Sequence, residues 1–174
     1  MDPYYGVYFS GDDKYGYAET VDQKSDTFEL PETGLLDNWH PMSLRLVGGK
    51  IADYLGSNLS CRLCSDRLRE ILERAATKED AIQWLPLIVA NESRGLSYSI
   101  LHFHNPPDVL CRKETIFAGD FVAKPVFLRH RIENHQVFAY PTAGKRKLFI
   151  SKRVKLAIEA AKCTGMVFEK TAVR

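Results

Sequence analysis

Residues 60–76 read SCRLCSDRLREILERAA, and the hydrophobic period changes inside this stretch. Up to Cys64, apolar and polar residues alternate as in a strand with one buried face. From Ser65 onward, the apolar residues recur at the i, i+3, i+4 and i+7 spacing of one helix face: Leu68, Ile71, Leu72 and Ala75. A serine at this position can accept a hydrogen bond from a free amide of the first turn. The stretch therefore predicts a strand followed by a helix over about residues 65–76.

The same pattern returns later in the chain, where a short strand over residues 148–150 leads into Ser151. The sequence from Ser151 predicts a second helix over about residues 151–163, closed by Gly165 and followed by a strand over residues 166–170. Two strand–serine–helix–strand units indicate an α+β fold, mostly antiparallel sheet with two principal helices. The length fits one compact domain over residues 1–174.

Further strands are expected wherever β-branched and aromatic residues cluster between turn residues. Two short strands around a turn are predicted within the first 20 residues. The other predicted strands cover residues 43–47, 81–90, 96–103, 121–128 and 136–140. Pro86 places the middle of its strand at a sheet edge or a bulge. On the first helix, Glu70 and Arg74 have the i,i+4 spacing of an ion pair.

The composition excludes several classes of protein. A chain of 174 residues with 45% hydrophobic and 26% charged residues can bury a core, which excludes wholesale disorder. No apolar run reaches the roughly 18 residues of a membrane span, so no membrane partner is expected. The first residues are acidic and polar, unlike a secretory signal. We therefore expect a cytoplasmic protein whose four cysteines are reduced thiols.

Charge is unevenly distributed between an acidic, Tyr-rich segment over residues 1–40 and a basic remainder over residues 41–174. The first segment holds nine of the 22 acidic residues and two of the 24 basic ones. Such segregation indicates two surfaces with different electrostatic preferences. The alternative is that the acidic and basic segments pair within one folded molecule.

Five of the eight tyrosines lie in the first 20 residues, among carboxylates. Tyrosine supplies rigid, amphipathic contact area, and carboxylates steer a basic partner, so this region is the best candidate partner-binding surface. Its predicted contact residues are Tyr4, Tyr5, Tyr8, Asp12, Asp13, Tyr15 and Tyr17. The alternative is that the tyrosines are half-buried in an N-terminal hairpin whose acids only face solvent.

A metal site is a weaker alternative. Its candidate ligands are Cys61, Cys64, His102 and His104, with Cys111 as a further candidate. His102 and His104 share one face of a strand, as two ligands must. Cys61 and Cys64, three apart on a strand, point to opposite faces, and no glycine provides a knuckle turn. Redox chemistry is disfavoured because both cysteines precede the helix start. We therefore expect neither a metal nor another cofactor.

Catalytic motifs of the common hydrolases and nucleotide-binding enzymes are missing from the sequence, which predicts a non-enzymatic protein. A nucleic-acid-binding module is the alternative function, because six cations fall within eleven residues: Lys145, Arg146, Lys147, Lys152, Arg153 and Lys155. The sequence pI of about 8.3 lies below that of a dedicated nucleic-acid-binding domain, so nucleic acid is not the expected partner.

Several segments of residues 55–170 resemble one bacterial family. These are LCSDRLREIL (63–72), QWLPLI (83–88), QVFAY (136–140), LFISKRVKLAIE (148–159) and CTGMVFE (163–169). They are similar to the "vS..lr.il", "ie.lPv", "iFr", "iFvSe.lk.al" and "tGl.Fe" patterns of the immunity proteins of polymorphic toxin systems, typified by a Myxococcus xanthus protein. The chain departs from the family at residues 108–115, where an Asp-containing "D.e.S" pattern is common, and residues 1–40 match no family pattern.

The resemblance implies an antitoxin that binds a cognate secreted toxin, encoded by the adjacent gene, and blocks it by stoichiometric occlusion in bacterial competition. It implies no catalytic residues. Delivery of such toxins by type VI secretion fits this class.

Overall fold

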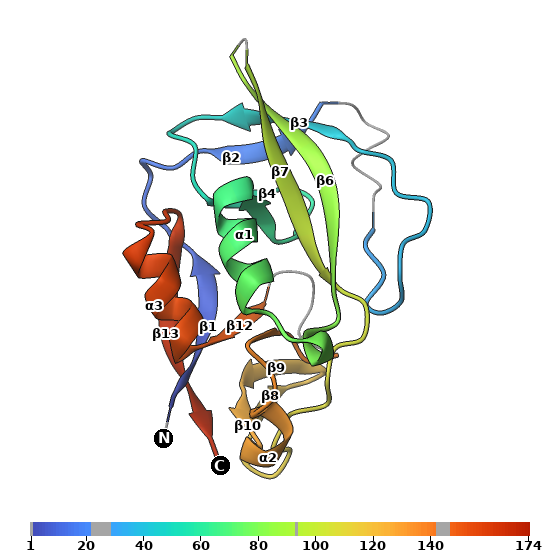
Figure 1. The fold of residues 1–174 in the computed structure, drawn as a ribbon, viewed down its shortest axis with the longest axis vertical. Coiled ribbons are helices and arrows are strands. Elements are labelled where there is room, and N and C mark those ends of the chain that lie inside the picture. Colours follow the sequence, from blue (N-terminus) through green and yellow to red (C-terminus); the bar gives the residue numbers. More distant parts are fainter. Residues whose placement is uncertain (1, 22–28, 93, 142–146) are drawn as a thin grey trace.

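The computed structural model describes residues 2–21, 29–92, 94–141 and 147–174 (Figure 1). Its strands are β1 Tyr4–Phe9, β2 Tyr17–Thr20, β3 Ser43–Val47, β4 Tyr54–Ser57, β5 Leu63–Ser65, β6 Ile82–Asn91, β7 Arg94–Phe103, β8 Ile116–Ala118, β9 Phe121–Lys124, β10 Val126–Phe127, β11 Val137–Phe138, β12 Leu148–Ser151 and β13 Met166–Val173. Its helices are α1 Asp66–Ala75, α2 Arg129–Ile132 and α3 Lys152–Ala160, with a 3-10 turn η2 at Lys78–Asp80. The fold is α+β and mostly sheet, as the sequence predicts.

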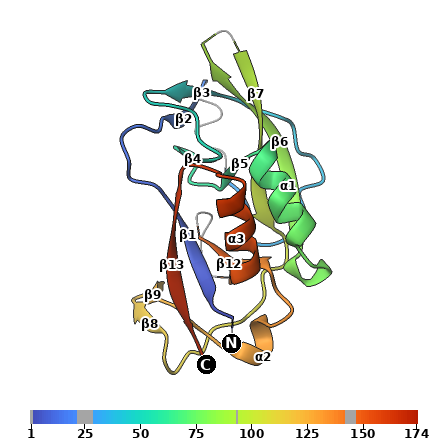
Figure 2. The same ribbon diagram turned by 60° about the vertical axis from the view of Figure 1, so that its left-hand side comes forward.

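The strands form a closed barrel, in the order β2-β3-β6-β7-β5-β4, and a five-stranded sheet, in the order β10-β13-β1-β12-β11. A separate ribbon consists of β8 and β9. Most pairs are antiparallel, and the parallel ones are β2 with β4, β3 with β6, and β10 with β13. Helix α3 covers one face of the five-stranded sheet, and α1 lies beside it (Figure 2).

The first two strands are present, but they do not form a hairpin. β1 pairs with β12 and β13 in the five-stranded sheet, whereas β2 pairs with β3 and β4 in the barrel. The hairpin alternative for the N-terminal tyrosines is therefore wrong. The connection between β1 and β2 instead passes from one sheet to the other.

Both serine-started helices are confirmed. The Ser65 hydroxyl accepts from the Leu68 amide at 3.3 Å, and the Ser151 hydroxyl accepts from the Val154 amide at 3.4 Å. The helices contact each other where the Arg153 guanidinium donates to the Ala75 carbonyl at 3.3 Å.

Three local predictions need correction, and β4 is an addition to them. Helix α3 ends at Ala160 and Lys162 takes the left-handed φ of 53°, so Gly165 does not close the helix but lies in the following turn with φ +87°. The i,i+4 pair on α1 joins Arg69 to Glu73 at 3.6 Å. The strand before α1 starts only at Leu63, and β4 was not predicted.

Pro86 lies at a sheet edge, one of its two predicted settings. β3 pairs with β6 only at residues 88–90, so at Pro86 one side of β6 faces no strand. The carbonyl of Pro86 accepts from the Trp39 indole at 2.8 Å instead. A residue without an amide hydrogen is tolerated here because no ladder bond is lost on that side.

Two hydrophobic cores share β7, because successive side chains of a strand point to opposite faces. Leu101 and Phe103 belong to the core that includes the five-stranded sheet and both long helices. Tyr98 and Ile100 belong to the core inside the barrel. In the described part of the chain, no helix is long and apolar enough to cross a membrane.

The carboxylate of Asp53 connects the start of α1 to the turn between α3 and β13. It accepts from the Ser65 hydroxyl at 2.7 Å and from the Arg67 guanidinium at 3.1 and 2.6 Å. On the other side it accepts from the amide and the hydroxyl of Thr164 at 2.8 and 3.1 Å. Burial raises the pKa of Asp53, but the hydrogen bonds from Arg67, Ser65 and Thr164 outweigh it and hold the pKa below its usual value.

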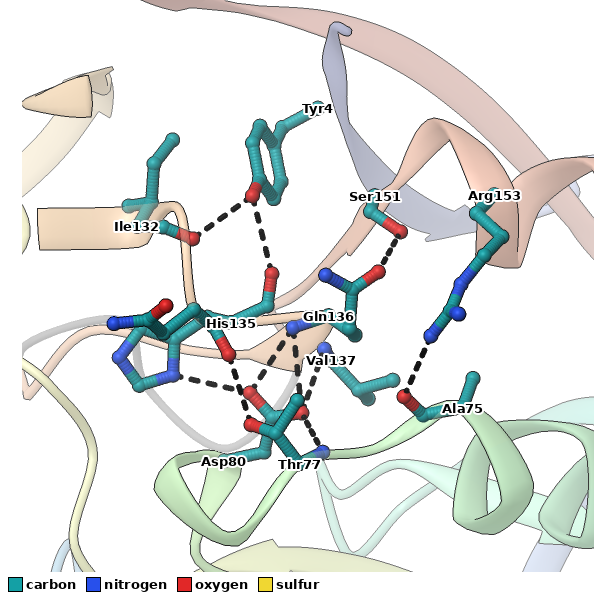
Figure 3. Close-up of polar contacts among 11 residues, drawn as sticks. Tyr4, Ala75, Thr77, Asp80, Ile132, His135, Gln136, Val137, Ser151 and Arg153 are labelled. Carbon is teal, nitrogen blue, oxygen red and sulfur yellow. Dashed lines mark hydrogen bonds and ion pairs between the residues drawn. The ribbon is translucent and has the colours of Figure 1, made fainter. Parts of the chain in front are cut away.

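A second buried carboxylate, that of Asp80 in η2, holds the segment that leads into β11 (Figure 3). It accepts from the amides of Thr77, Gln136 and Val137 at 2.8, 3.1 and 3.2 Å. The His135 Nδ1 lies 3.0 Å from the same carboxylate. No sequence pattern indicates this cluster. Apart from Thr77, its members lie 55 or more residues from Asp80 in the chain.

We predict that Asp80→Asn lowers the free energy of unfolding by at least about 3 kcal/mol, because an amide nitrogen would then face buried donors. Urea denaturation followed by circular dichroism measures the change. The exposed neighbour Glu79 provides the matched control, and Glu79→Gln should change stability by less than about 0.5 kcal/mol. An equal effect of both substitutions would contradict the role of Asp80.

The lowered pKa of Asp53 predicts a pH dependence of stability. Its contribution is fully present above the unfolded-state value of 3.8 and is lost as the pH falls through the lower folded-state pKa. We therefore expect Asp53→Asn to destabilise the protein by about 2 kcal/mol at pH 7, with the difference from the wild type shrinking below about pH 4. Urea denaturation between pH 7 and pH 3 checks this. A difference that is constant across this range would contradict the assignment.

Candidate partner-binding surface

A hollow of about 250 Å³ lies where the β1–β2 connection meets β4 and the turn before β13. We call it the acidic hollow. Its lining residues are Phe9, Ser10, Gly11, Asp12, Asp13, Tyr15, Gly16, Tyr17, Tyr54, Gly56 and Gly165. Four of the seven predicted contact residues therefore surround one depression, namely Asp12, Asp13, Tyr15 and Tyr17.

The β1–β2 connection is held against the turn at residues 48–50. The Gly16 amide donates to the Lys50 carbonyl at 2.8 Å, and the Lys50 amide donates to the Lys14 carbonyl at 2.6 Å. This approach requires Gly49, because a Cβ there would lie 2.4 Å from the Gly16 nitrogen, and its φ is +37°. The rim of the hollow is thus fixed by backbone contacts.

The hollow combines exposed carboxylates with aromatic rings. Asp12 pairs with Lys14 at 2.6 Å, and the hydrogen bond from Lys14 lowers the pKa of Asp12. Asp13 is exposed and has no ion pair among the described residues. The Tyr17 ring is 41% exposed and packs against Gly56, where an added Cβ would lie 3.1 Å from it. The arrangement offers negative charge beside aromatic surface that is fixed in place.

The floor of the hollow comes from residues that were not predicted to be part of the contact surface. Tyr54 is buried and stacks on Phe9, with ring centroids 4.6 Å apart. The Ser10 amide donates to the Gly165 carbonyl at 2.9 Å, which brings the end of β1 to this floor. Tyr54 belongs to β4, a four-residue strand that is buried almost throughout. Its sequence therefore does not alternate between apolar and polar residues, which is the pattern that predicts a strand.

The other three predicted tyrosines lie elsewhere. Tyr4 is buried, and its hydroxyl donates to the carbonyls of Ile132 and His135 at 2.8 and 3.1 Å (Figure 3). Tyr5 is half-buried beneath the Lys155 amine, which lies 5.3 Å from its ring centroid. Tyr8 is exposed on the sheet, opposite Val167 of β13. Tyr4 is therefore a core residue and offers no surface to a partner.

The weaker metal alternative meets a geometric obstacle. Cys61 lies in the barrel core and Cys64 in the other core, so the two thiols do not converge, as their spacing predicts. His102 is buried and its Nε2 lies 2.8 Å from the Gly34 carbonyl. Among the described residues, no three His, Cys, Asp or Glu side chains, His104 included, are grouped so as to hold a metal ion.

The basic cluster is divided among internal contacts. Burial lowers the pKa of Lys147, whose amine donates to the Val122 carbonyl at 2.7 Å. Lys152 pairs with Asp2 at 3.6 Å, and Lys155 pairs with Glu159 at 2.5 Å. Arg153 caps α1, and Lys145 and Arg146 lie outside the described residues. The four described members thus present no continuous basic face to a phosphate backbone.

Residues 12–173 match a protein-family model described as "Immunity protein family (Imm11)". The matched region contains both serine-started helices and most of the acidic hollow. It begins at Asp12, so most of the acidic N-terminal segment belongs to the family pattern, contrary to the expectation that residues 1–40 lie outside it. Comparison with curated proteins finds no match.

The burial of Cys61 and Cys64 predicts that both thiols are inert in the folded protein. Burial also raises the pKa of Cys64, which removes the reactive thiolate. With iodoacetamide at pH 8, we expect Cys111 to be labelled first, while Cys61 and Cys64 react only after urea is added. Peptide mass spectrometry gives the order. Rapid labelling of Cys64 in the native protein, or a stoichiometric zinc ion that raises the melting temperature, would contradict this assignment.

Proposed function

Because the chain belongs to the Imm11 immunity protein family, we propose that it binds a cognate bacterial toxin and neutralises it by occlusion. The toxin is a secreted protein encoded by the adjacent gene and delivered by a system such as type VI secretion. The immunity protein acts in the cytoplasm of the producing cell and its kin. It performs no catalysis and needs no cofactor, since covering the active surface of the toxin is sufficient.

The observation that carries this proposal is the family match, which spans nearly the whole chain. The acidic hollow supports it, because the hollow has the two properties that a tight protein interface uses. Fixed aromatic rings provide desolvated contact area, and carboxylates accelerate encounter with a basic surface. A toxin that acts on nucleic acid would present such a basic surface. The carboxylates of the hollow would then occupy the position of the phosphate backbone.

The proposal is tested by expressing the toxin domain of the adjacent gene with and without this chain. Survival of cells that express both proteins, together with a 1:1 complex on size-exclusion chromatography, is the expected result. Cell death in spite of soluble immunity protein, or no complex at micromolar concentration, would overturn the proposal. Catalytic inactivation of the toxin allows its purification for binding measurements.

Within this proposal, the charge of the hollow should control the association rate. We predict that Asp13→Lys slows association with the toxin about tenfold at low salt, because steering by an exposed charge acts mainly on the encounter rate. Tyr17→Ala should instead raise the dissociation rate about tenfold, because a packed aromatic contact is lost. Surface plasmon resonance separates the two rates.

Asp37→Lys is the matched control, since Asp37 is an exposed acid outside the hollow and its substitution changes the net charge equally. It should alter either rate by less than about twofold. If Asp37→Lys and Asp13→Lys slow association equally, net charge alone controls the encounter. The hollow would then not be the contact surface.

A further inference from the structure

The ribbon of β8 and β9 exposes three large apolar side chains on a short stretch of chain. Ile116 is 56% exposed, Phe117 44% and Phe121 79%. No other large apolar side chain in the described part of the chain is more exposed than Phe121. Phe117 lies opposite the buried Val122 and Phe121 lies opposite Ala118, so Phe121 points to the outer face of the ribbon. An aromatic ring this exposed, on a ribbon with two further exposed apolar residues, is a candidate interaction site.

The base of this ribbon is fixed to the protein. Val122 is buried in the core that includes the five-stranded sheet, and the Lys147 amine donates to its carbonyl at 2.7 Å. The Thr115 hydroxyl donates to the Val126 carbonyl at 3.3 Å and accepts from the Val126 amide at 3.2 Å. The exposed rings are thus carried on a support that is already ordered, which reduces the entropy lost on binding.

Among the described strands, β8 and β9 pair only with each other. The five-stranded sheet separates this ribbon from α3, as Figures 1 and 2 both show. Phe121 is therefore not covered by the helices that bury the rest of that core. Most of its ring is therefore open to water.

The charges around the ribbon are mainly positive. Arg112, Lys113 and Lys124 are exposed and have no carboxylate partner among the described residues. Glu114 is already paired with Arg174 at 2.7 Å, which leaves Asp120 in the turn as the ribbon's remaining acid. These three cations lie at the base of the ribbon, since Lys124 pairs with Ile116 and residues 112 and 113 precede β8. A complementary partner surface carries carboxylates at this base.

We propose that the β8–β9 ribbon is a second contact with the toxin, in which Phe121 inserts into an apolar pocket while carboxylates of the toxin face the cations at the base of the ribbon. This inference rests on the proposed function, since the toxin is its partner. It adds an anchor of opposite charge to the acidic hollow. The toxin must then present a basic region to the hollow. To the ribbon it must present an apolar pocket with acidic residues nearby.

The two contacts fit within one interface. β13 begins beside the acidic hollow and ends beside β10, and its eight residues span about 25 Å. A standard interface of about 800 Å² per partner is about 30 Å across, enough to cover both.

Tyr8 and Val167, both exposed, lie opposite each other on β1 and β13 between the two contacts. In the view of Figure 2, the β1–β2 connection and the ribbon lie on the same side of the molecule.

The test measures the affinity of the catalytically inactive toxin domain for purified variants by isothermal titration calorimetry. We expect Phe121→Ala to raise Kd at least tenfold without lowering the melting temperature, because the ring makes little contact within the free protein. Phe121→Leu should recover most of the affinity, since it restores apolar volume. Lys124→Glu should weaken binding and reduce its dependence on salt.

Leu156→Ala is the matched control, because Leu156 is 53% exposed on α3, on the other face of the five-stranded sheet. Its Kd should stay within twofold of the wild type. If the wild type binds the toxin and Phe121→Ala binds equally well, the ribbon is not a contact, while the proposed function stands. If the wild type does not bind the toxin at all, the proposed function fails and this inference fails with it.

Discussion

The hydrogen-bonded carboxylate of Asp53 is the contact on which the arrangement of the rest depends. It joins the cap of α1 to the turn between α3 and β13 by accepting from Ser65, Arg67 and Thr164. A buried carboxylate is costly unless its partners are in place, so the two segments are fixed relative to each other. The Thr164 carbonyl in turn accepts from the Tyr54 amide at 3.1 Å. The same turn therefore supplies the floor of the acidic hollow.

The sequence predicts the local parts of this fold well, because their causes are local. The change of period at Ser65 and Ser151, together with a hydroxyl that can cap a first turn, is sufficient to place both helices. The sequence does not predict that β1 and β2 enter different sheets. Strand pairing depends on residues far apart in the chain, such as Tyr4 opposite Ser151, and no turn signal specifies it. The same holds for the contacts of Asp53 and Asp80, whose partners lie up to 111 residues away.

For the candidate binding surface, composition indicated a region whose residues the structure divides between a hollow and the core. The density of tyrosine and aspartate near the N-terminus groups Asp12, Asp13, Tyr15 and Tyr17, which line one hollow in the structure. It also includes Tyr4, because a strand that enters a sheet buries one face and exposes the other, and composition does not reveal which. The exposure of Phe121 was not predicted for a related reason. In sequence it looks like any apolar strand residue, and only the isolation of β8 and β9 leaves it exposed.

Part of the charge segregation along the chain is neutralised within the fold. Among the described residues, two ion pairs join the acidic segment to the basic remainder: Glu19 with Arg45 and Asp2 with Lys152. Both are at the surface and contribute little to stability. The unpaired charges, negative at the hollow and positive at the ribbon, are then available for recognition. In the complex that we propose, a partner with charges in the reverse order would be repelled at both ends, so the two contacts would select one orientation as well as one partner.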